Sequence, residues 1–173
     1  MKIFTTKLLF IQQSFSVVGL TLIFTLIFTS SFSQTPVRFY SHAKAGYKNP
    51  VTGAVIVEPN YDAGSDFREG FAIVMTGRKR GYINEKGEVA IALQYDDARN
   101  FAEGLAAVKK DGHWGFVDPK GTLTIPLQYT DAFFFHDGIA RVSDGTKGFY
   151  IDKNNKWVKD EEKHQEEWET QQK

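Results

Sequence analysis

Cysteine is missing from all 173 residues of the chain. Without thiols the protein has no disulfide bond, no thiolate metal ligand and no cysteine nucleophile. A lipid-anchored form of export signal, which needs a cysteine, is excluded as well. A domain without disulfides depends on its hydrophobic core. The chain has 15 Phe, 7 Tyr and 3 Trp, and those beyond residue 33 supply large side chains for a core.

An excess of charge of one sign is also lacking, since the chain has 21 basic and 21 acidic residues. Residues 1–33 contain two Lys and no acid, so the remainder has 19 basic and 21 acidic residues and a net charge of −2. A balance so close to neutral gives no electrostatic footprint for nucleic acid or for an anionic membrane. We therefore expect neither as a partner.

The longest apolar run lies near the N-terminus, from Val17 to Phe28, behind the basic residues Lys2 and Lys7. Small residues at 31 and 33 then precede Gln34. This layout predicts a signal peptide at residues 1–33 and export to the periplasm or the outside of the cell. The alternative is an uncleaved anchor, which would be the protein's one membrane contact, but the run is shorter than the roughly 20 residues of a membrane span.

A 34-residue repeat dominates the rest of the chain. Three segments align without a gap, and they are Phe67–Val74, Phe101–Val108 and Phe135–Val142. Gly53, Gly87 and Gly121 are in the same register. A fixed period of this length is typical of an architecture in which one supersecondary unit is copied and stacked.

The middle unit contains three strand candidates, at Leu105–Lys110, Trp114–Asp118 and Thr122–Pro126. Turn residues separate them at 111–113 and 119–121, and Pro126 is expected to end the third strand because it cannot donate a hydrogen bond. The sequence therefore predicts an all-β fold, a tandem array of three-stranded antiparallel β meander repeats. We expect about three full units, with a degenerate half unit before them.

This pattern divides the chain into four parts. Residues 1–33 are the expected signal peptide, 34–46 a linker and 47–158 the repeat domain. Residues 159–173 are highly charged and are expected to form a short terminal helix or a disordered tail.

Alternation along the first strand of each unit predicts which side chains face the core. The expected core positions are Ala72, Val74, Ala106, Val108, Ala140 and Val142. The position between them holds Ile73, Ala107 and Arg141, and the Arg predicts that it faces solvent. The dipeptides that precede these strands are Glu69-Gly70, Glu103-Gly104 and Asp137-Gly138. We expect positive φ at the Gly and a carboxylate that accepts hydrogen bonds from turn amides.

The middle unit resembles the WG-repeat family, also called KWG repeats, over roughly residues 44 to 158 of the chain. The matching residues are Phe101, Glu103-Gly104-Leu105-Ala106, Val108, His113-Trp114-Gly115-Phe116-Val117-Asp118, Gly121 and Ile125-Pro126. The Trp-Gly pair that names the family occurs here once, and Arg80-Gly81 and Gly148-Phe149 replace it elsewhere. The resemblance implies a β-rich repeat domain with an interaction role and without a shared catalytic set.

Catalytic and metal-binding chemistry finds little support in the pattern. Acids that recur at one position of every unit are expected to be structural, because an active site is needed once. The turns 84–87, 118–121 and 152–155 resemble calcium loops, but each has a Lys among its ligand positions and none has a distal acid, so we interpret them as hairpin turns. The four His lack metal-ligand spacing, and no nucleophile elbow or phosphate loop is present. We expect no enzyme activity, cofactor or metal.

Residues that break the repeat are the candidate binding residues. Arg78, Lys79 and Arg80 form a basic hairpin turn, which is either a solvated turn or a contact for an acidic partner. Phe133 and Phe134 precede the repeated Phe135, and they are either additional core residues or exposed aromatic anchors. The sequence predicts an exported binding or scaffolding module of the cell envelope that recognises a protein or a glycan. The alternatives are a self-associating structural envelope protein and a glycan-directed hydrolase.

Overall fold

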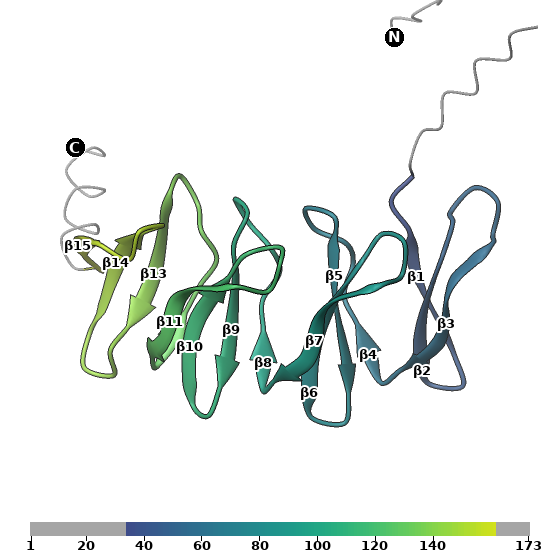
Figure 1. The fold of residues 1–173 in the computed structure, drawn as a ribbon, viewed down its shortest axis with the longest axis horizontal. Coiled ribbons are helices and arrows are strands. Elements are labelled where there is room, and N and C mark those ends of the chain that lie inside the picture. Colours follow the sequence, from purple (N-terminus) through teal and green to yellow (C-terminus); the bar gives the residue numbers. More distant parts are fainter. Residues whose placement is uncertain (1–33, 162–173) are drawn as a thin grey trace, which may run out of the picture. The chain divides into compact units, whose positions relative to one another are not determined.

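A computed structural model describes residues 34–161 of the chain. The expected signal peptide at 1–33 and most of the expected tail lie outside these residues. The described residues form antiparallel strands, as the sequence predicts, and these are grouped into four successive sheets (Figure 1). The predicted three-stranded unit is wrong for the last three sheets, because each has an additional strand of two residues, β4, β8 or β12. Within 34–161 no helix is long and apolar enough to cross a bilayer.

The first sheet has three strands and each later sheet has four. The strands of the first sheet are β1 (Val37–Ser41), β2 (Lys44–Lys48) and β3 (Val55–Tyr61). Those of the second are β4 (Ala63–Gly64), β5 (Phe71–Thr76), β6 (Lys79–Asn84) and β7 (Val89–Tyr95). Those of the third are β8 (Asp97–Ala98), β9 (Ala106–Lys110), β10 (His113–Val117) and β11 (Leu123–Tyr129). Those of the fourth are β12 (Asp131–Ala132), β13 (Ile139–Ser143), β14 (Gly148–Asp152) and β15 (Trp157–Asp160).

The first sheet corrects two expectations. Its strands begin at Val37, so most of the expected linker 34–46 is β-structure, and the expected half unit is a complete meander. An alignment of the repeats without gaps does not detect this meander, because its turn between β2 and β3 contains one extra residue. Lys48 pairs with Val55 across six intervening residues, whereas the equivalent Ile83 pairs with Val89 across five. At the other end, β15 occupies residues that were expected in the tail.

Stacked aromatic pairs join the sheets. The ring pairs are Tyr47 with Phe67, Tyr82 with Phe101 and Phe116 with Phe135, with centroids 4.9–5.2 Å apart and edge-to-face geometry. In each pair one ring comes from β2, β6 or β10, and the other comes from the segment between the first two strands of the next sheet. Such pairs contribute about 0.5–1.5 kcal/mol beyond the burial of their area. The repeated Phe therefore anchors each unit to the unit before it.

Both faces of the inner sheets are buried, which corrects the expected orientation of one strand position. The expected core residues of β5, β9 and β13 are buried as predicted. The intervening residue does not face solvent: Ala107 is 1 % exposed, and Ile73 packs against the core that the second and third sheets share. Arg141, on the last sheet, keeps a side chain that is 32 % exposed. The face that was expected to meet water meets the next sheet instead.

The third strand of each unit is longer than the sequence predicts. β11 continues through Pro126 to Tyr129, because a bulge leaves this proline outside the ladder and on an exposed edge. Opposite the bulge lies Gly115, and a Cβ on this residue would stand 2.5 Å from the carbonyl oxygen of Ile125. A Cβ on Gly81 or Gly46 would come equally close to a main-chain oxygen of β7 or β3. The glycine of the Trp-Gly pair is needed for this close approach of two backbones.

Replacing Gly115 by Ala should destabilise the protein by about 1–3 kcal/mol, the usual range for overpacking a tight site. The added methyl group collides with main-chain atoms, which cannot rotate away as a side chain does. Urea denaturation measures the change in unfolding free energy. Gln128→Ala, an exposed change on the facing strand, serves as the control and should stay within about 0.5 kcal/mol of wild type. Equal midpoints for the two variants would contradict this account of the glycine.

Candidate functional site

The basic turn is held largely by the next unit. The ammonium of Lys79 lies 2.6 Å from a carboxylate oxygen of Asp96, and Arg80 lies 2.7 Å from one of Asp97. The hydrogen bond from Lys79, followed by one from the amide of Asp111, lowers the pKa of Asp96. Arg78 is exposed in the turn between β5 and β6. Two of the three candidate residues, Lys79 and Arg80, thus form ion pairs with Asp96 and Asp97, and Arg78 does not pair with either acid.

Phe133 lies in a stack of alternating rings and guanidinium groups. Arg99 stands 4.6 Å from its ring centroid and Arg141 stands 5.3 Å from it. The same Arg99 is 4.9 Å from the ring of Trp114, and its guanidinium is 3.3 Å from Asp131. Phe133 is half-buried in this stack, so it contributes to packing between the third and fourth sheets.

Phe134 is different, because 56 % of its surface is exposed. It lies just before the turn that begins β13, whereas Arg78 lies in the turn that ends β5. These two turns lie at opposite ends of equivalent strands (Figure 1). The structure therefore does not bring the predicted basic and aromatic residues into one site.

The repeated acid of each turn binds the turn of the next unit. The carboxylate of Glu69 accepts hydrogen bonds from the amides of Glu103 and Gly104, at 2.7 and 2.8 Å. Glu103 in turn accepts one from the amide of Gly138 at 3.0 Å. The glycines have the expected positive φ, and so do the acids themselves, at 50–53°. For Glu69 and Glu103 the expectation that these acids accept turn amides is confirmed, but the amides belong to the neighbouring unit.

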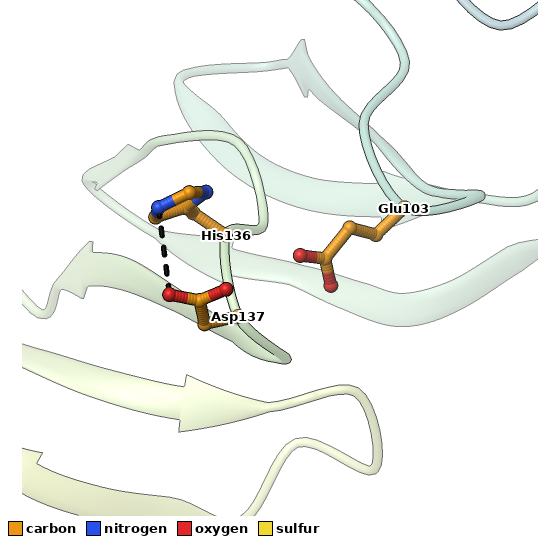
Figure 2. Close-up of side chains that lie close together, drawn as sticks. All are labelled: Glu103, His136 and Asp137. Carbon is orange, nitrogen blue, oxygen red and sulfur yellow. Dashed lines mark ion pairs between the residues drawn. The ribbon is translucent and has the colours of Figure 1, made fainter.

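Glu103, His136 and Asp137 form a cluster at the last of these turns, with one possible ligand atom from each within 4.8 Å of the others (Figure 2). A metal ion there would compete with Lys153, whose ammonium is 3.2 Å from the Glu103 carboxylate. The hydrogen bond from Lys153 also lowers the pKa of Glu103. The geometry is explained by the contact between turns, and the cluster carries no metal assignment.

The turns with a resemblance to calcium loops use their first side chain to hold main-chain amides. The Asp118 carboxylate accepts from the amides of Lys120 and Thr122, at 2.9 and 2.8 Å, and Asp152 repeats this pattern. Asn84 does the same with an amide oxygen. The hydrogen bond from Thr122 is the largest of the effects that lower the pKa of Asp118. An oxygen acceptor is required at this position, and a negative charge is not.

The change Asp118→Asn should preserve this turn and reduce the acid sensitivity of the protein. The pKa of Asp118 is lowered in the folded state, so its stabilising effect is present above the unfolded value of about 3.9 and is lost as the pH falls through the folded value. Melting temperatures from pH 7 to pH 2 measure the effect. Asp118→Ala, the matched control, should melt lower at every pH because it loses both hydrogen bonds. An unchanged acid slope in Asp118→Asn would contradict the assignment.

An exposed apolar row was missed by the sequence analysis. The first residue of the last strand in each sheet (β3, β7, β11 and β15) is apolar and between 42 and 56 % exposed. These residues are Val55, Val89, Leu123 and Trp157, and we name them the edge row. Each is 34 residues from the next, so the repeat itself was the available signal. It went unused because attention was given to positions that break the repeat.

Comparison with known proteins agrees with this architecture. The model of the WG containing repeat matches three consecutive segments, residues 46–79, 81–113 and 114–147, which together make up more than half of the chain. No curated protein matches the sequence. The matched segments contain the Phe anchors, the acid-glycine turns and the glycines that face the bulged strands. The chain therefore belongs to the WG-repeat family.

Proposed function

We propose that this repeat protein is an exported, non-enzymatic binding or scaffolding module of the cell envelope, with a protein as its partner and a glycan as the alternative. The observation that carries the proposal is the edge row, which presents an apolar side chain from every unit at one position of the repeat. Stacked repeats provide extended surfaces of the kind used in recognition. Export is inferred from residues 1–33 alone, and intact mass of the secreted protein tests it.

The charged groups at the two ends of the array favour a binding module over self-association. In the second, third and fourth sheets a buried apolar residue of the middle strand pairs across one face with residues of both neighbouring strands. These residues are Ile83, Val117 and Ile151. In the first sheet the equivalent residue is Lys48, paired with Val37 and Val55. A further sheet stacked on this face would bury the ammonium of Lys48, which is costly without a partner.

The opposite end has a comparable feature. Arg141 stands on the last sheet at the position that Ile73 and Ala107 occupy in earlier units. Its Nε donates to the Glu161 carboxylate at 2.7 Å, and this hydrogen bond raises the pKa of Arg141. Polar terminal units keep repeat arrays soluble and limit stacking between copies.

The acids give no support to the hydrolase alternative. A general acid that works near neutral pH needs a carboxyl group whose pKa is raised. Among residues 34–161, the carboxyl groups with shifted pKa values are shifted downward, by hydrogen bonds from basic side chains, from main-chain amides or, for Asp144, from the Thr146 hydroxyl. These groups are suited to structural roles in turns and between units.

Replacing Lys48 by Ile should promote end-to-end association. The change gives the first sheet the apolar row of an inner sheet, so the first sheets of two copies can stack on each other without burying the ammonium of Lys48. We expect the wild type to sediment as a monomer and Lys48→Ile to show a mass that rises with concentration. Lys86→Ile, in an exposed turn, is the control and should remain monomeric. A wild type that already associates would favour the self-associating structural alternative.

Affinity capture from envelope extract tests the binding proposal. The variant Arg78→Glu, Phe134→Ser changes the two exposed candidate residues and leaves the ion pairs of Lys79 and Arg80 in place. We expect the wild type to retrieve a specific protein and the variant to retrieve less of it, if the predicted residues are the site. Equal retrieval by both proteins would move the site elsewhere. Retrieval of nothing by the wild type would contradict the binding function.

A further inference from the structure

Among residues 34–161, the edge row lies on strands that pair with a neighbouring strand on one side. β3, β7, β11 and β15 are each at the end of the strand order of their sheet. Their first residues are therefore at the margin of the stack, and they keep about half of their surface exposed. In β7 and β11 the next residue on the same face, Ile91 or Ile125, is buried. A row with one apolar side chain from each of four units is a surface that a partner can cover.

The spacing of the row restricts the partner. Sheets that pack face to face lie about 10 Å apart, so successive members of the row are separated by about this distance. An α-helix advances about 10.5 Å in seven residues and returns to nearly the same face. An extended strand repeats a face every two residues, or about 6.6 Å, which does not match. The spacing of the row thus matches the spacing of apolar residues on a helix that carries one at every seventh position.

The charges beside the row set a direction. In the second unit Glu85 and Glu88 stand in the turn before Val89. The equivalent residues of the fourth unit are Lys153 and Lys156, and those of the third are the uncharged Pro119 and Thr122. Lys153 is paired with Glu103. Over the whole turns 84–88, 118–122 and 152–156, the net charge is −1, 0 and +1, so the charge along the row changes from negative to positive between β7 and β15. A helix complements such a field when its positive N-terminus lies over the glutamates and its negative C-terminus over the lysines.

We propose that the edge row is the docking site for an amphipathic helix of a protein partner, about 20 residues long, with its N-terminal half over the first and second sheets and its C-terminus over the fourth. The inference rests on the proposed binding function and specifies the class of partner. The helix places an apolar residue against each of Val55, Val89, Leu123 and Trp157. Its charges are opposite to those of the turns that it crosses.

A synthetic peptide is the probe for this site. It has 22 residues, Leu at every seventh position, helix-forming Ala and Gln between them, Lys near the N-terminus and Glu near the C-terminus. Two control peptides have the same composition, one with Leu at every fifth position and one with the Lys and Glu exchanged. Fluorescence anisotropy of the labelled peptides measures the Kd, and circular dichroism of the mixture measures helix formation.

The protein variant is Val89→Ser, Leu123→Ser, and the matched control is Tyr40→Ser, an exposed aromatic residue outside the row. We expect the heptad peptide to bind tenfold or more weakly to the row variant, to bind the control variant as it binds wild type, and to gain helix on binding. Thermal melts check that both variants are folded. The proposal is overturned if the three peptides bind wild type with equal Kd values, or if the heptad peptide binds wild type and the row variant equally. It is also overturned if the heptad peptide does not bind wild type.

Other occupants appear as separate outcomes. Association with phosphatidylcholine vesicles that the row variant loses would make the row a lipid surface and overturn the proposal. So would a self-associated mass that the row variant loses, because a second copy would then be the occupant. If wild type and row variant retrieve one partner equally from envelope extract, this inference fails while the proposed binding function stands.

Discussion

Face-to-face stacking of small sheets is the constraint on which the rest of the structure depends. A three- or four-stranded sheet of this size cannot bury an apolar face alone, so each unit needs a neighbour. The contact is made by an aromatic ring from the middle strand against the repeated Phe of the next unit, at three successive junctions. Because inner sheets are covered on both sides, small residues such as Ala107 stand where the next backbone approaches.

Polar contacts follow the same plan. Tyr47 and Tyr82 each donate a hydroxyl hydrogen bond to a carbonyl of the next unit, that of Ser65 or Arg99, at 2.7 Å. Burial raises the pKa of Tyr47 to about 12, so this hydroxyl remains a donor. The repeated acid of the turn before β5, Glu69, and the basic residue Lys79 of β6 also pair with groups of the following unit. Most of the side chains that looked like candidates for chemistry are thus accounted for as contacts between repeats.

The surface that these contacts leave uncovered is available to a partner. A repeat array offers the same position many times, and a partner with its own period can use all of them at once. The edge row meets this condition, whereas Phe134 and Arg78 are single exposed residues at opposite ends of the strands. A search restricted to residues that break the repeat therefore overlooks the surface that the repeat itself creates.

The amino-acid pattern by itself determined the period, the strands, the positive-φ glycines and the inward face of the first strand, because turn chemistry and period-2 alternation are local. Three features required the tertiary structure. Alternation shows that a strand has two faces but not whether the second face meets water or another sheet. The prediction that Ala107 faces solvent was therefore wrong. The partner of Glu69 lies one unit away, and the extra residue before Val55 hid the first sheet. These depend on how units stack, which no single unit encodes.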